Sequence, residues 1–142
     1  AVESALRLAR SYTKKFEVVS FWGGFHGKTS GVLGLMGSDF KHGLGPLQGG
    51  QHIVPYADCY RCPFKTTYPT CGLACVDFLR QLIRLNTAGS LAAIIVEPIQ
   101  GTAGNVISLR CSSKWEAKFV IGSMMGVVCC VAAFTRLPFS AR

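Results

Sequence analysis

The sequence predicts an α/β fold in which helices alternate with the strands of a buried, parallel sheet. A short apolar run with β-branched residues at 17–21 and a continuous apolar run at 91–97 that ends in one carboxylate indicate buried strands, and continuous runs are typical of parallel sheets. Two segments with helical spacing of apolar side chains, at residues 1–10 and 71–88, precede these runs. The 142 residues are enough for one domain with its own core.

The first helix is predicted from an apolar stripe, and the first strand follows it directly. The stripe recurs at i, i+3, i+4 and i+7 and consists of Val2, Ala5, Leu6 and Ala9. Residues 17–21 form the strand, and three glycines within residues 22–27 end it. Residues 28–36 follow as a helix that is loosened by two glycines.

The second half of the predicted fold repeats this order after a long loop. Residues 37–55 hold five glycines and no clear period, which predicts a loop of the length that usually carries function. The helix at 71–88 ends before Gly89, a residue type that commonly stops helices, and the strand at 91–97 follows it. The apolar stripe of this helix consists of Leu73, Val76, Leu79, Leu82 and Ile83.

Composition excludes several classes of protein. The chain is 49% hydrophobic and only 15% charged, which excludes a disordered chain. The net charge of +8 does not indicate a nucleic-acid partner, because residues 107–142, with five basic residues and one acidic residue, contribute half of it. The local basic cluster is interpreted as the solvated face of the first helix, and it consists of Arg7, Arg10, Lys14 and Lys15.

The segment 107–142 differs in character from the rest of the chain. It contains 17 uncharged residues in a row at 119–135, slightly short of the ~20 that a membrane-spanning helix needs. Membrane association through 119–135 therefore stays an alternative that we do not favour. No signal peptide is recognisable, and the odd number of cysteines, seven, favours reduced thiols. We expect an intracellular protein, in the cytoplasm or the mitochondrial matrix.

Two polar features follow the two predicted strands. Phe25, His26 and Gly27 come after the first strand, and Glu97 ends the second. Ligands of open α/β sheets bind outside the carboxyl ends of the strands, so these residues are candidates for a site. The alternatives are a histidine that is packed for structural reasons and a carboxylate that is satisfied by a neighbouring arginine.

Four cysteines form a second candidate site with the spacing C-x2-C-x8-C-x3-C. Four thiolates in two short pairs can bind zinc, but the middle gap is shorter than in common zinc ribbons and fingers. Buried free thiols and redox pairing are the alternatives, and a non-catalytic metal-binding module is a rival interpretation of the whole chain. The four residues are Cys59, Cys62, Cys71 and Cys75.

Taken together, the motifs resemble a known family over residues 1 to about 106. The segments concerned are AVESALRLAR, VVSFWGGFHGKTSGVLGL, HIVPYADCYRCPF and LAAIIVEPIQGTAGN. They resemble the class-III, fold-type-I aminotransferases that depend on pyridoxal 5'-phosphate, among them 4-aminobutyrate and ornithine aminotransferases and 2,2-dialkylglycine decarboxylase. The resemblance implies part of a three-layer αβα large domain, a homodimeric parent, and transfer of an amino group from an amino acid or ω-amine to a 2-oxo acid.

The resemblance also implies roles for individual residues. Phe25 matches the aromatic residue that stacks on the pyridine ring of the cofactor, and His26 and Gly27 follow it in the same motif. Glu97 matches a strand-end glutamate near the cofactor and substrate. The motif is completed by Gln100 and Gly101.

Three anchors of the family's cofactor have no match in this sequence. They are the phosphate-binding turn, the aspartate that holds the pyridine nitrogen and the lysine that forms the Schiff base; Lys114 and Lys118 stand in no matching context. We therefore expect no catalytic residue and no catalysis by this chain alone. Residues 107–142 are predicted to be an unrelated tail, from a truncated gene model, intron read-through or frameshift.

Overall fold

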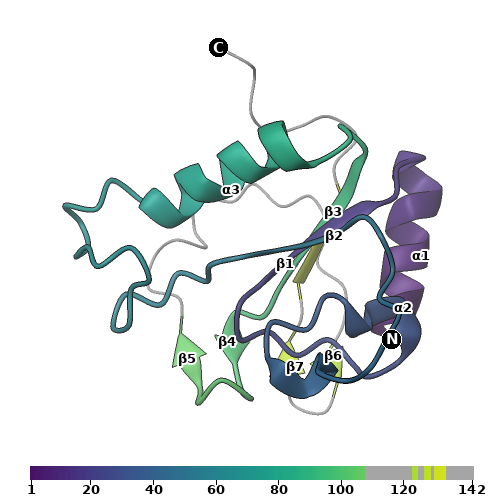
Figure 1. The fold of residues 1–142 in the computed structure, drawn as a ribbon, viewed down its shortest axis with the longest axis horizontal. Coiled ribbons are helices and arrows are strands. Elements are labelled where there is room, and N and C mark those ends of the chain that lie inside the picture. Colours follow the sequence, from purple (N-terminus) through teal and green to yellow (C-terminus); the bar gives the residue numbers. More distant parts are fainter. Residues whose placement is uncertain (108–122, 125–126, 129, 134–142) are drawn as a thin grey trace.

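A four-stranded sheet forms the centre of the fold in the computed structural model, which describes residues 1–107, 123–124, 127–128 and 130–133 (Figure 1). Its strand order is β2-β1-β3-β8, and these strands span Gln51–Val54, Glu17–Phe21, Leu91–Val96 and Cys130–Ala133. β1 pairs in parallel with both β2 and β3, whereas β8 pairs antiparallel with β3. The predicted parallel sheet is therefore confirmed.

Helices cover both faces of the sheet, as expected for a three-layer αβα arrangement (Figure 1). α1 (Val2–Thr13) packs on one face through the predicted stripe, with Ala5, Leu6 and Ala9 buried against Val18. On the other face, the buried side chains belong to α3 (Ala74–Asn86) and to the strands, and they include Val19, Val54, Leu79, Ile83 and Ile94. Each fully buried aliphatic side chain of this kind contributes about 1.5–3 kcal/mol of transfer free energy.

Two sequence predictions between β1 and α3 are corrected by the structure. The helix expected at 28–36 is a single turn, α2 (Ser30–Leu33). The segment 37–55, expected to be a loop, contains the 3-10 turn η1 (Asp39–Lys41) and the strand β2. β2 is only four residues long and has no apolar pattern of its own. It is a strand because it pairs with β1.

The small elements lie near the ends of the main sheet. β4 (Ile99–Gln100) pairs antiparallel with β5 (Val106–Ile107), and β6 (Ser123–Met124) pairs antiparallel with β7 (Val127–Val128). Most of the apolar run 119–135 lies outside the described residues. Among the helices that the structure describes, none has the length and hydrophobicity needed to cross a bilayer.

The end of β1 fits against the loop at Gly37 with no room for a side chain. The Gly23 amide donates to the Gly37 carbonyl at 2.8 Å, and the Gly37 amide donates to the Gly24 carbonyl at 2.9 Å. A Cβ atom at position 37 would lie 2.1 Å from the Phe21 carbonyl oxygen. This close backbone contact fixes the start of the 22–27 segment.

At the opposite end of the sheet, Glu17 ties β1 to the turn that precedes β3. This carboxylate is 3% exposed, and it accepts hydrogen bonds from the amides of Ala88 (2.9 Å) and Ser90 (2.8 Å). His52 Nε2 lies 3.2 Å from Glu17 Oε1. Burial raises the pKa of Glu17, but the two amides and His52 outweigh it, so that the pKa lies below the ordinary value of 4.5.

We expect Gly37→Ala to destabilise the chain by more than about 2 kcal/mol, because backbone atoms must move and the two backbone hydrogen bonds of Gly37 are strained. Gly49→Ala is the control, since no atom lies within 4 Å of a Cβ placed there. It should change the free energy of unfolding by less than about 1 kcal/mol. Urea denaturation measures both, and equal effects would contradict the packing described for Gly37.

Protonation of Glu17 should weaken the fold at acidic pH. The pKa of Glu17 is lower in the folded chain than in the unfolded chain, so ionised Glu17 stabilises the fold at any pH above the unfolded-state pKa. This stabilisation is lost as the pH falls through the folded-state pKa. Urea denaturation between pH 7 and about pH 3 should therefore show a smaller loss of stability for Glu17→Gln than for wild type. Glu3→Gln, which alters an exposed carboxylate of α1, should keep the wild-type slope.

Candidate functional site

The candidate site lies at the carboxyl ends of two parallel neighbours, β1 and β3. The segment 22–27 follows β1, and Glu97 follows β3. Parallel pairing brings both segments to the same edge of the sheet, where open α/β sheets bind their ligands. A hydrogen bond from the Phe25 amide to Glu97 Oε1 joins them directly. The structure thus brings together the two features that the sequence singled out separately.

Glu97 is a buried carboxylate with incomplete hydrogen bonding. Glu97 is 1% exposed, and its Oε2 makes no hydrogen bond of normal geometry within the part of the chain that the structure describes. Burial raises the pKa of Glu97 above 4.5, and the amides of Phe25 and Gly101 only partly offset this effect. An incompletely paired carboxyl group at a strand end is available to a cationic or proton-donating group of a ligand.

Phe25 presents a half-buried aromatic ring beside this carboxylate. Its ring packs edge-to-face on Phe40, with the ring centres 5.8 Å apart and the planes at 87°. Phe40 comes from η1, and the ammonium group of Lys28 lies 5.1 Å from its ring centre. The sequence pattern gave no sign of Phe40, because it lies in a glycine-rich segment without a period.

His26 lies behind the loop rather than at its surface. The residue is 4% exposed, and its amide donates to the Met36 sulfur at 3.3 Å. Burial lowers the pKa of His26 to about 4, so the ring is neutral at physiological pH. A Cβ at Gly24 would lie 2.9 Å from His26 Nε2, and Gly27 has a φ of 118°, so both glycines allow the loop to bend around this ring.

Two further side chains hold the strand ends in place. Gln100 is 2% exposed, and its Nε2 donates to the Trp22 carbonyl at 2.8 Å, which links β4 to the segment that carries Phe25. The Tyr56 hydroxyl donates to the carbonyl of Glu97 at 2.8 Å. The sequence patterns did not identify Tyr56 as a residue of this site. Gly101, predicted as support for the motif, begins the turn that the Gly104 amide closes at 3.1 Å.

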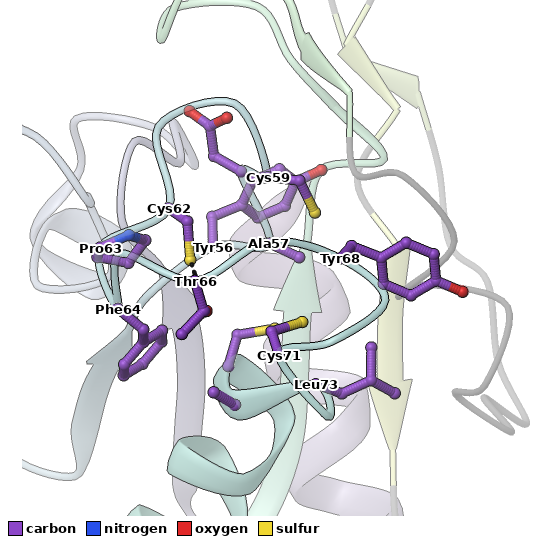
Figure 2. A pocket seen from close by; sticks show the side chains of 13 residues that line it. Tyr56, Ala57, Cys59, Cys62, Pro63, Phe64, Thr66, Tyr68, Cys71 and Leu73 are labelled. Atoms are coloured by element: carbon purple, nitrogen blue, oxygen red, sulfur yellow. Dashed lines mark hydrogen bonds between the residues drawn. The ribbon is translucent and has the colours of Figure 1, made fainter.

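The four predicted cysteines line one pocket near the start of α3 (Figure 2), and Glu97 is not among the residues that line it. All four are partly exposed free thiols. Among the described residues, no group of three or more His, Cys, Asp or Glu side chains is arranged to hold a metal ion. The geometry therefore gives no support to the zinc interpretation.

Comparison with known proteins assigns the family. The model of the family "Aminotransferase class-III" matches residues 1–111. The leucine/methionine racemase of Thermococcus litoralis is 36% identical over 110 residues, covering 75% of this chain and 25% of the relative. The diaminobutyrate–2-oxoglutarate aminotransferase of Rhizobium meliloti is 37% identical over 107 residues, covering 73% and 23%.

Solved structures agree with the sequence relatives. An amine transaminase from an uncultivated Pseudomonas species, in its PLP-bound form, superposes with a TM-score of 0.69 at 31% identity, covering 75% of this chain and 26% of that one. An (S)-enantioselective ω-transaminase from Thermomicrobium roseum gives a TM-score of 0.66 at 27% identity, covering 74% and 25%. The chain spans about a quarter of the length of these proteins. It belongs to the class-III aminotransferase family and corresponds to a fragment of the α/β domain of these enzymes.

Proposed function

We propose that residues 1–106 form part of the large domain of a transaminase that moves an amino group from an amino acid or ω-amine to a 2-oxo acid. The hydrogen bond between the Phe25 amide and Glu97 carries this proposal, because it places an aromatic ring and a buried carboxylate together at the ligand-binding edge of the sheet. Family membership supports the same chemistry. The proposed parent is an intracellular homodimer.

The described residues fit one side of a pyridoxal 5'-phosphate site. Phe25 offers a flat apolar ring on which a pyridine ring stacks, and Glu97 has a carboxylate oxygen without a normal hydrogen bond. When bound, the cofactor supplies an electron sink for substrate carbanions. Phe25 supports the ring from one side, and the neutral His26 behind the loop adds no charge there.

Glu97 can act on the ligand side in two ways. As a carboxylate it pairs with a cationic group, and as a carboxylic acid, which its raised pKa favours, it donates a hydrogen bond. Gln100 and Tyr56 are positioning residues, because Gln100 binds the Trp22 carbonyl in the segment that carries Phe25, and Tyr56 binds the backbone carbonyl of Glu97.

We further propose that the 142-residue chain does not catalyse the reaction alone. Its sequence has no match to the family's lysine, aspartate or phosphate turn, and these groups supply most of the cofactor's attachment. Stacking contributes only about 0.5–1.5 kcal/mol. This is far less than the ~4 kcal/mol that corresponds to a dissociation constant of 1 mM, so binding through Phe25 alone is expected to be considerably weaker than 1 mM.

The chain, mixed with pyridoxal 5'-phosphate, an ω-amine and a 2-oxo acid, should show no amino transfer above a protein-free blank.

The contact of the chain with the cofactor ring is tested by NMR with pyridoxamine 5'-phosphate, which has no aldehyde and cannot condense with surface lysines. Amide shifts should change near Phe25, Gly27 and Glu97, and Phe25→Ala should abolish these changes. Tyr60→Ala, at a 92% exposed ring, is the control and should keep them.

Enzymatic turnover by the chain would contradict the inactivity proposal. Shift changes that survive Phe25→Ala would contradict the stacking role of Phe25.

Glu97→Gln should stabilise the chain at pH 7, because burial raises the pKa of Glu97 in the folded chain above its unfolded value, and ionisation of the carboxyl group therefore opposes folding. The gain should shrink as the pH falls below the unfolded-state value, where the wild-type carboxyl is protonated in both states. Urea denaturation of both proteins between pH 7 and about pH 3 measures the difference. A variant that is less stable at pH 7 would show that Glu97 is satisfied as a carboxylate.

A further inference from the structure

The cysteine pocket stands apart from the candidate cofactor site and brings together thiols from two parts of the chain. Cys59 and Cys62 lie in the segment after β2, whereas Cys71 lies in the turn before α3 and Cys75 in the first turn of that helix. Figure 2 shows Cys59, Cys62 and Cys71 around the same hollow, beside Phe64, Tyr68 and Leu73. The cysteine side chains have access to solvent, and none forms a disulfide among the described residues.

The two cysteines of the C-x2-C pair are held at a tight turn. Tyr60 and Arg61 form a turn, with Cys59 and Cys62 on either side of it. Asp58 Oδ1 holds this turn by accepting hydrogen bonds from the amides of Tyr60 and Arg61, both at 3.1 Å. Such turns bring the first and fourth Cα atoms to within about 7 Å, the range from which a disulfide can form. The turn therefore puts the Cα atoms of Cys59 and Cys62 within the range from which a disulfide can form.

The surroundings of the two thiols differ in a way that assigns them different roles. The thiol of Cys62 contacts Thr66 Oγ1 at 3.5 Å, and hydrogen bonding from that hydroxyl and from the Thr66 amide lowers its pKa. Burial raises the pKa of Cys59, and the other three thiols and Asp58 raise it further. Of these two thiols, Cys62 therefore forms a thiolate more readily than Cys59.

We propose that Cys62 is a peroxide-reactive nucleophile and that Cys59 is its resolving thiol, so that this pocket is a reversible oxidation site. The Cys62 thiolate attacks the O–O bond of a hydroperoxide, forming a sulfenic acid and releasing hydroxide or alkoxide. The Cys59 sulfur then attacks the sulfenic sulfur, an S–S bond forms, and the departing oxygen leaves as water with the Cys59 proton. The two thiols are oxidised by two electrons, and the peroxide is reduced.

The pocket is also connected to the strand end that carries Glu97. Tyr56 lines the pocket, and its hydroxyl donates to the Glu97 carbonyl. Oxidation at Cys59 and Cys62 therefore takes place three and six residues along the chain from Tyr56, whose side chain positions Glu97.

Tryptic mapping of the full chain after treatment with dilute hydrogen peroxide tests the proposal. Cleavage at Lys41, Arg61, Lys65 and Arg80 puts Cys59 in peptide 42–61, Cys62 in peptide 62–65, and both remaining pocket cysteines in peptide 66–80. We expect peptides 42–61 and 62–65 to become linked and dithiothreitol to separate them. A Cys71–Cys75 bond would instead leave peptide 66–80 unlinked and lighter by two hydrogens.

Three variants separate the roles. Cys62→Ser should leave Cys59 reduced, and Cys59→Ser should leave Cys62 as a sulfenic acid that dimedone traps. Thr66→Val, which removes the hydroxyl but keeps the shape, should slow alkylation of Cys62 by iodoacetamide at pH 7 by about tenfold for each unit that the pKa rises. Cys71→Ser is the matched control and should keep the link between peptides 42–61 and 62–65.

Three results would overturn the proposal. One is oxidation of Cys59 in Cys62→Ser at the wild-type rate. Another is a link that forms first within peptide 66–80. The third is a purified chain that holds one zinc ion per molecule and resists peroxide, which would make the pocket a metal site.

Discussion

A single hydrogen bond, from the Phe25 amide to the Glu97 carboxylate, joins the two strand ends on which the candidate site depends. It can form because β1 and β3 are parallel neighbours, so that the segments after them leave the sheet at the same edge. Two further hydrogen bonds maintain this arrangement, from the Gln100 side chain to the Trp22 carbonyl and from the Tyr56 hydroxyl to the Glu97 carbonyl. Gly37, which has no side chain, allows its loop to lie against the end of β1. Loss of any one of these contacts would displace the ring or the carboxylate.

The two buried carboxylates of the sheet illustrate the difference between a structural group and a site group. Glu17 accepts two amide hydrogen bonds and contacts the His52 ring, and its pKa is lowered despite burial. Glu97 is as deeply buried, but one of its oxygens has no normal hydrogen bond among the described residues, and its pKa rises. The first arrangement stabilises the fold, whereas the second leaves an unsatisfied acceptor for a ligand to complete.

The main elements were predictable from the sequence because their signals are local. The apolar runs predict the buried strands β1 and β3, and the periodic stripes predict the buried faces of α1 and α3. Phe25 and Glu97 were found because they stand where those two strands end. β2 was not predictable, since four residues gain strand geometry only from pairing with β1. Phe40, Tyr56 and the Glu17–His52 pair depend on contacts between distant segments, which no local pattern encodes. The division of the chain at 106, and the origin of residues 107–142, stay predictions, although β8 pairs with β3.

The link between Glu97 and Phe25 is most directly tested by following both groups in one NMR titration of the full chain. The Glu97 side-chain carbonyl carbon reports its ionisation, and the Phe25 amide proton reports the hydrogen bond that it donates. The account predicts a midpoint above 4.5 for Glu97 and a shift of the Phe25 amide with the same midpoint. A Glu97 midpoint at or below 4.5, or a Phe25 amide that does not respond to it, would contradict the account.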